Sequence, residues 1–248
     1  MKLTHTNRIF NKNGYVLIRG FFNKDEANNI VKYANEIQNL PEVKNKWLTY
    51  YEKNNNVRKK SRVENFTNYH EGINNLLYQK IIPSINKELG ENYTLFKDKI
   101  NWKLPNGKGF KAHQDYPAWS DFPPKFYITV ALFGNNSTKE NGCLQFSNFE
   151  SKTLLPENFD ENKLEWNHEE ATPNDLLIFN SYVPHRSSEN NSDKSRRIFY
   201  FTFNRELEGN YYQEYFNKKK IEFPQDLDRD ENSKINYNTK YNYANPFS

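Results

Sequence analysis

Residues 174–203, NDLLIFNSYVPHRSSENNSDKSRRIFYFTF, carry the pattern that decides the fold. Two apolar runs, residues 176–179 and 198–203, have the length of strands, and the second is rich in aromatic side chains. Turn-forming Pro, Asn, Ser and Asp residues fill the segment between them. We therefore expect two β-strands joined by a polar loop.

The same pattern recurs earlier in the chain, at residues 15–18, 93–104, 126–133 and 142–146. Repeated short strands are typical of a β-sandwich or barrel. Aromatic residues are 16% of the chain and hydrophobic residues 35%, so Phe and Tyr must build much of the core, as suits a pleated sheet. The sequence predicts a mainly β fold with flanking helices.

Helices are expected before these strands. Asn23 and Glu26 form a capping-box signal ahead of apolar residues at helical spacing. A second helix should run from about residue 72 to 89, with a break or kink at Pro83. We expect one domain spanning residues 1–248, with helical support mainly within 23–90, a β core at about 93–205 and an irregular tail at 206–248.

Composition excludes several classes of function. The formal net charge is +4, from 35 basic and 31 acidic residues spread along the chain, so a general nucleic-acid role is unsupported. The densest basic run, Arg58-Lys59-Lys60 with Arg62, is interpreted as a solvated loop.

Two further features of the sequence bear on the cellular compartment of the protein. No run approaches the roughly 18 apolar residues that span a bilayer, which argues against membrane insertion. A single cysteine, Cys143, rules out an intramolecular disulfide and fits a reducing compartment. We expect a cytoplasmic protein, and the sequence leaves its oligomeric state open.

A candidate metal site emerges from the few histidines. In an extended segment, residues two apart point to the same face, so His113 and Asp115 can converge on one ion. His185 follows the apolar strand 176–179, whose end can present it to the same ion. Two imidazoles and one carboxylate leave open positions that suit Fe(II) with a chelating cosubstrate and O₂, although zinc would also accept these ligands.

Arg196 strengthens this interpretation. It opens the strand that follows His185, and a guanidinium fork can bind the distal carboxylate of a dicarboxylate through two hydrogen bonds. Arg197 should face the opposite side of the strand, where a surface or ion-pair role is expected.

Taken together, these segments resemble the phytanoyl-CoA dioxygenase superfamily of Fe(II)- and 2-oxoglutarate-dependent oxygenases over nearly the whole chain. The matching segments are residues 14–16, 113–115, 140–144, 174–179 and 184–187, leading to Arg196. The resemblance implies a double-stranded β-helix, or cupin-like jelly roll, with helices backing one sheet and iron near the open mouth.

The resemblance also implies roles for single residues. His113, Asp115 and His185 would ligate Fe(II), Arg196 would anchor 2-oxoglutarate, and Asn101 would contact the other end of that cosubstrate. Such enzymes consume 2-oxoglutarate and O₂ while they hydroxylate a small molecule. Related halogenases carry a small residue at the aspartate position, so Asp115 points to hydroxylation.

The substrate expectation rests on a bacterial branch that includes phosphonate α-hydroxylases, which residues 98–105 and 175–197 resemble. The resemblance suggests hydroxylation of methylphosphonate or 2-aminoethylphosphonate beside phosphorus. A phosphonate dianion needs cationic donors, and Lys103 and Arg186 are candidates. The other expected substrate contacts, on loops around the mouth, are Tyr116, Trp119 and Ser181.

Other functions stay open at this point. The substrate could be an amino-acid derivative or a natural-product intermediate. The chain could instead be a zinc- or manganese-dependent cupin-like isomerase, or a non-catalytic metal-binding jelly-roll protein. Release of succinate from 2-oxoglutarate would separate an oxygenase from both rivals.

Overall fold

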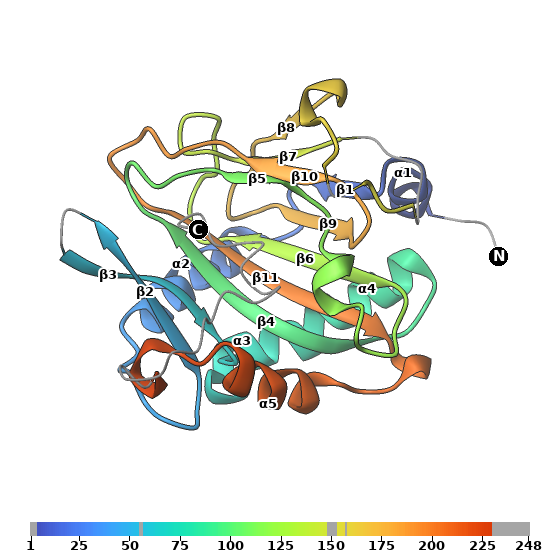
Figure 1. Ribbon diagram of the computed structural model, residues 1–248. Helices are drawn as coiled ribbons and strands as arrows, with labels where there is room; N and C mark the ends of the chain where they lie inside the picture. Colours follow the sequence, from blue (N-terminus) through green and yellow to red (C-terminus); the bar gives the residue numbers. More distant parts are fainter. Residues whose placement is uncertain (1–3, 55–56, 148–152, 157, 230–248) are drawn as a thin grey trace.

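Two antiparallel β-sheets face each other in the computed structural model (Figure 1). The structure describes residues 4–54, 57–147, 153–156 and 158–229. In spatial order, the larger sheet contains β1 (Tyr15–Ile18), β9 (Leu176–Asn180), β6 (Tyr127–Phe133), β11 (Arg196–Arg205), β4 (Tyr93–Lys103), β3 (Val57–Glu64) and β2 (Leu48–Asn54). The smaller sheet contains β5 (Phe110–His113), β10 (His185–Ser187), β7 (Leu144–Phe146) and β8 (Asn167–Glu169). This is the double-sheet arrangement expected of a jelly roll.

Helices flank the larger sheet. Those on its outer side are α2 (Lys24–Gln38), α3 (Glu71–Leu76), the π-helical turn η2 (Leu77–Ile81) and α4 (Ile82–Leu89), and α1 (His5–Asn13) contacts β1 and α4. α5 (Tyr212–Glu222) lies apart from this group and contacts β4 (Figure 1). α2 contacts β3 and β6, and α4 contacts β4. Within the described ranges, no helix has the length and apolar character needed to cross a bilayer.

The predicted start of α2 is confirmed. The side chain of Asn23 accepts hydrogen bonds from the backbone N–H groups of Asp25 and Glu26, both at 3.0 Å. In return, the carboxylate of Glu26 accepts from the Asn23 backbone N–H at 2.9 Å. This capping box satisfies N–H groups that have no partner inside the helix.

Pro83 interrupts the second predicted helix, as expected. It lies in the first turn of α4, directly after the π-helical turn η2. A proline lacks the N–H that would continue the helical ladder, and its ring clashes with the preceding turn. The local change to a π-helical turn lets the chain continue past this residue.

The basic run at residues 58–62 is not a solvated loop, and that interpretation is wrong. It forms β3, which pairs with β2 and β4 and so extends the larger sheet. The start of the strand, including Arg58 and Lys59, is exposed, whereas its end is buried, and Arg62 there is 8% exposed. Residues 55–56 lie outside the described part of the chain.

The expectation of an irregular tail is also wrong for the segment after β11. Helix α5 forms there because Tyr212, Tyr215, Phe216 and Lys219 follow helical spacing and bury one face. Tyrosine combines an apolar ring with a polar hydroxyl. The apolar face of this helix was therefore not recognised in a segment that is otherwise polar. Residues 230–248, the rest of the expected tail, lie outside the described residues.

Core packing separates the two faces of the larger sheet. Phe199 and Phe201 of β11 pack on the helix side, and both contact Phe66 edge to face. Ile198 and Tyr200 alternate with them and face the interior between the sheets. The interior face of β11 and its neighbours therefore forms one wall of the space between the sheets.

Candidate metal centre and adjoining cavities

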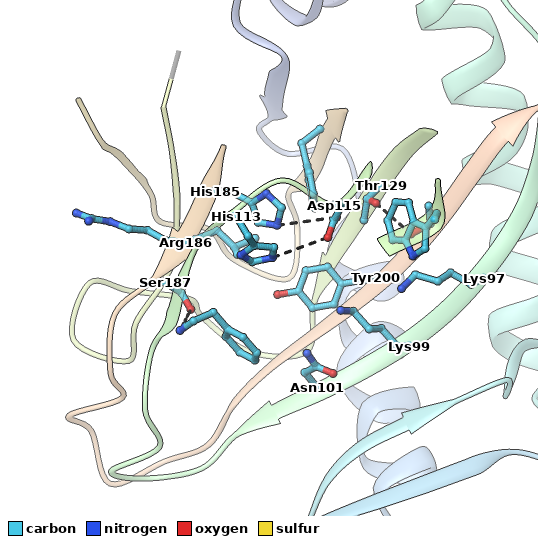
Figure 2. Close-up of a pocket in the computed structure, with 15 residues that line it drawn as sticks. Lys97, Lys99, Asn101, His113, Asp115, Thr129, His185, Arg186, Ser187 and Tyr200 are labelled. Atoms are coloured by element: carbon cyan, nitrogen blue, oxygen red, sulfur yellow. Dashed lines mark hydrogen bonds and ion pairs between the residues drawn. The ribbon is translucent and has the colours of Figure 1, made fainter. Parts of the chain in front are cut away.

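Two neighbouring strands of the smaller sheet bring the predicted metal ligands together. His113 ends β5, His185 begins β10, and the two residues are cross-strand partners. Asp115 lies two residues beyond His113, just before a 3₁₀ turn (Tyr116–Trp119). Figure 2 shows the three side chains converging, and their candidate ligand atoms all lie within 4.8 Å of one another.

The distances inside this group suit a shared cation. Nε2 of His113 lies 3.8 Å from Oδ1 of Asp115, and Nε2 of His185 lies 3.9 Å from Oδ2. Both distances exceed that of a hydrogen bond. Metal–ligand distances of about 2 Å require ligand atoms to stand apart in this way around a common ion.

Backbone carbonyls orient both imidazole rings. Nδ1 of His113 lies 2.7 Å from the carbonyl oxygen of Lys111, and Nδ1 of His185 lies 3.1 Å from that of Val183. A carbonyl oxygen can only accept, so Nδ1 carries the proton in each neutral ring. The lone pair of each Nε2 is left facing Asp115, the arrangement found in metal-binding histidines.

The charge states of this group also match a metal-binding set. Burial, reinforced by the neighbouring His185, lowers the pKa of His113 to about 4, which keeps the ring neutral. Burial opposes ionisation of Asp115, but His185, His113 and Lys99 outweigh it and lower the pKa of this carboxyl group. Neutral imidazole and ionised carboxylate are the forms that bind metals.

Arg196 is the first residue of β11, lies opposite Lys103 of β4, and is 1% exposed. Its Nη1 donates to the carbonyl oxygen of Gly142, while its buried Nε has no hydrogen-bond partner within the described residues. Gly142 has a φ of +73°, and a Cβ there would collide with the carbonyl oxygen of Ser188. A buried guanidinium nitrogen without an acceptor is a ready binding group for a carboxylate.

A small cavity of about 30 Å³ adjoins the metal centre. All three candidate ligands line it, together with Asn101 and Tyr200 on the interior faces of β4 and β11. Oδ1 of Asn101 is buried without a hydrogen-bond partner in the described part of the chain. This amide is therefore available to a bound molecule.

A larger cavity of about 200 Å³ shares His113 and Asp115 with the smaller one. Trp119, expected as a substrate contact, stands in its wall. The charged side chains in the wall, besides the metal-site residues, are Arg62, Glu64, Lys97, Lys99 and Lys219. Four of these five are cationic, so the cavity suits an anion.

Two other expected substrate contacts are engaged in packing instead. Tyr116 stacks on Tyr182 with ring centroids 4.7 Å apart. Ser181 is 1% exposed, and its hydroxyl oxygen accepts from the backbone N–H of Tyr127 at 3.3 Å. Both side chains therefore support the loop after β9.

The two cations expected to bind phosphonate also have protein partners. Lys103 donates to the hydroxyl of Ser187 at 2.7 Å and to the carbonyl of Ser188. Arg186 donates through Nε to Gln145 at 2.9 Å, and its guanidinium lies 4.3 Å from the Trp166 ring centroid. Figure 2 shows Arg186 pointing away from the metal centre.

Sequence reasoning missed the cations that do line the larger cavity. Lys97 and Lys99 alternate with buried neighbours along β4, on the same face as Asn101. Alternation within the predicted strand 93–104 would have placed all three on one face. Arg62 was missed because its segment was interpreted as a loop.

Comparison with known proteins agrees with this geometry. The family model described as phytanoyl-CoA dioxygenase (PhyH) matches residues 10–198. A 2-aminoethylphosphonate dioxygenase from an uncultured bacterium (HF130_AEPn_1) is 39% identical over 246 residues, covering 94% of each chain. A methylphosphonate hydroxylase from Gimesia maris is 34% identical over 227 residues, covering 87% of this chain and 86% of that protein.

Solved structures share the fold. EctD from S. alaskensis, determined with 2-oxoglutarate and 5-hydroxyectoine, aligns with a TM-score of 0.71 at 15% identity, covering 82% of this chain and 76% of that one. At that identity the likeness establishes the jelly-roll fold. The family match and the two relatives go further: the chain belongs to the phytanoyl-CoA dioxygenase family of Fe(II)- and 2-oxoglutarate-dependent oxygenases.

Proposed function

We propose that this protein hydroxylates a small organophosphonate at the carbon bonded to phosphorus. His113, Asp115 and His185 would hold Fe(II), and Arg196 would anchor 2-oxoglutarate. The observation that carries the proposal is the group of three ligand atoms within 4.8 Å that opens onto a cation-lined cavity. A non-catalytic jelly roll would need neither the ligand group nor the adjoining cation-lined cavity.

Support for the iron site comes from the protonation and orientation of its side chains. Both imidazoles have Nδ1 held by a backbone carbonyl, so each can offer only Nε2 to an ion. Two imidazoles and one carboxylate on one side of the ion leave positions for a chelating cosubstrate and O₂. When bound, Fe(II) with 2-oxoglutarate and O₂ supplies the oxidation of a C–H bond, and 2-oxoglutarate leaves as succinate and CO₂.

Support for the cosubstrate site comes from a buried donor. Nε of Arg196 lacks a partner within the described residues. Asn101 lines the small cavity beside the metal centre, where its amide NH₂ would be the group that donates to 2-oxoglutarate. The guanidinium of Arg196 would bind the distal carboxylate of 2-oxoglutarate, since a planar fork matches a carboxylate. The buried setting excludes water and strengthens that ion pair.

Support for a phosphonate comes from relatives and from cavity size. The two curated relatives are named for 2-aminoethylphosphonate and methylphosphonate. A cavity of about 200 Å³ is smaller than the roughly 300–1,000 Å³ typical of sites for drug-sized ligands. A coenzyme A thioester is therefore a poor fit, whereas a phosphonate of a few heavy atoms can be enclosed.

Turnover in air tests the proposal. The purified protein with Fe(II) and 2-oxoglutarate is incubated with methylphosphonate or 2-aminoethylphosphonate. We expect a new phosphorus resonance from the α-hydroxylated product, with succinate formed in equal amount. The His185→Ala variant serves as the negative control. Succinate without any hydroxylated phosphonate would refute the substrate assignment, and no succinate under any condition would refute the reaction.

A further inference from the structure

We propose that Lys97 and Lys99 of β4, together with Arg62 of β3, bind the phosphonate group of the substrate. The inference rests on the proposed function and names the residues that recognise the anion. It replaces Lys103 and Arg186, the two cations suggested by the sequence. The three residues belong to neighbouring strands, because Arg62 pairs with Asn101 in the β3–β4 ladder.

The three cations lie beside the metal centre. All three line the larger cavity, whose wall also includes His113 and Asp115. Lys97 and Lys99 also line the smaller cavity, so they stand where the two spaces meet. Figure 2 shows both lysine side chains extending from β4, on the same side of the site as Asp115 and Tyr200.

The two lysines lack a countercharge in direct contact. Within the described residues, neither ammonium group forms a hydrogen bond or an ion pair, and each lies over an aromatic ring. Nζ of Lys97 lies 4.6 Å from the Trp119 ring centroid, and Nζ of Lys99 lies 5.0 Å from that of Tyr200. A buried ammonium without an anion is unfavourable, and a bound dianion would relieve that.

Glu64 does not supply this countercharge. Its carboxylate is fully buried and accepts hydrogen bonds from Lys219 of α5 at 2.7 and 2.6 Å. Glu64 pairs with Lys99 along the β3–β4 ladder, yet its oxygens are engaged by Lys219 and, at 3.5 Å, by Nη1 of Arg62. The wall of the cavity therefore has an excess of positive charge beyond this pair.

The alternative cations are already engaged. Lys103 donates to Ser187 and Ser188, and it lies opposite Arg196, at the proposed cosubstrate end. Arg186 is held by Gln145 and by Glu161, whose carboxylate lies 3.4 Å away. Binding phosphonate with either residue would first require these contacts to break.

This placement has a consequence for the site of hydroxylation. The lysines share one cavity with His113 and Asp115, so a phosphonate held by them keeps its attached carbon close to the metal centre. Carbons further from phosphorus would lie toward the rest of the cavity. The subsite thus selects both the class of substrate and the carbon that reacts.

Binding measurements on Lys97→Gln and Lys99→Gln test the assignment. Calorimetric titrations without O₂, on the full chain loaded with Fe(II) and 2-oxoglutarate, give the Kd for methylphosphonate and 2-aminoethylphosphonate. We expect each variant to bind both phosphonates at least about tenfold more weakly, because each loses one charge-assisted hydrogen bond. Affinity for 2-oxoglutarate should be unchanged.

Arg186→Gln is the matched control, since it removes a nearby cation that points away from the metal centre, and it should bind phosphonate as the wild type does. If a glutamine variant fails to fold, Lys97→Met or Lys99→Met keeps the length of the side chain in an apolar form. Lys99→Arg keeps the charge and should retain most of the affinity.

Three results would overturn the assignment. Wild-type phosphonate affinity in the Lys97 and Lys99 variants, with hydroxylation intact, would reject the subsite and leave the proposed function standing. A selective loss of 2-oxoglutarate affinity would make these lysines part of the cosubstrate site. If the wild-type protein binds neither phosphonate, the proposed substrate class fails together with the subsite.

Discussion

The two faces of strand β11 differ sharply, although their residues alternate along one backbone. Toward the smaller sheet the strand presents Arg196 and Tyr200: Tyr200 lines the small cavity beside the metal centre, and Arg196 donates to the carbonyl oxygen of Gly142. Toward the helices it presents Phe199 and Phe201, which pack against Phe66. Residues two apart in the strand therefore lie on the same face and contact the same region, whereas adjacent residues lie on opposite faces.

Strand β4 repeats this division. Lys97 and Lys99 face the cavities, whereas Ile100, the partner of Phe199, belongs to the apolar core on the helix side. The apolar face fixes the register, because a slip by one residue would exchange the two sets of side chains. Precise placement of polar groups on the interior face thus depends on packing on the other face.

Removing a candidate metal ligand from the smaller sheet, which faces the interior side of β11, should have the largest effect. His185→Ala deletes one of three candidate ligands, and we expect Fe(II) affinity to fall by more than about 100-fold, beyond the effect of losing an outer-shell partner. Equilibrium dialysis under argon measures it. His168→Ala, at an exposed histidine on β8, should bind iron normally. Full iron occupancy in His185→Ala would refute the ligand assignment.

Truncating the helix-facing side should affect stability instead. Phe201 is fully buried, so Phe201→Ala should lower the free energy of unfolding by about 3–5 kcal/mol. Denaturant titration measures that loss. The folded fraction should still bind Fe(II) with wild-type affinity. A folded variant with weakened iron binding would show that the two faces are not independent.

The adjacent arginines provide the closest comparison between the faces. Arg196→Ala should weaken 2-oxoglutarate binding by about 10- to 100-fold, the effect of losing a charge-assisted ion pair. Arg197 turns outward and donates to Asn35 of α2, so Arg197→Ala should change that affinity less than about threefold. Titration of 2-oxoglutarate into both variants measures this, and the reverse order would mean that the strand register is misassigned.

The smallest expected effect lies furthest from the metal centre. Asn23→Ala removes the N-cap of α2, and we expect a loss of about 1 kcal/mol in unfolding free energy. Iron and 2-oxoglutarate affinities should not change, because α2 lies behind the larger sheet. Thermal melts and ligand titrations on one preparation measure both. A change in either affinity would extend the functional region through the sheet.

Much of the fold and the three candidate ligands could be predicted from the sequence. Strand pattern, the Asn23 cap and the Pro83 interruption depend on local residues, and the structure confirms each of them. His113 and Asp115 were linked by spacing alone. Their approach to His185 was inferred from the end of strand 176–179 and from family resemblance, but the pairing of β5 with β10 that produces it was not predicted.

The lining of the larger cavity could not be predicted in the same way. Arg62 reaches the cavity only because β3 joins the sheet beside β4, a pairing between distant segments. Lys219 arrives from α5, whose aromatic face was hidden among polar residues. Arg186 stood next to His185 in the sequence, yet alternation along β10 turns it away from the metal centre.

The central claim is that the space between the two sheets holds Fe(II), 2-oxoglutarate and a phosphonate together. Anaerobic addition of Fe(II) and 2-oxoglutarate to the purified protein tests it most directly, through the weak visible charge-transfer band of the chelated iron. We predict a band in the wild type that shifts when 2-aminoethylphosphonate or methylphosphonate is added, and no band in His185→Ala. The absence of a band in the wild type would contradict the account.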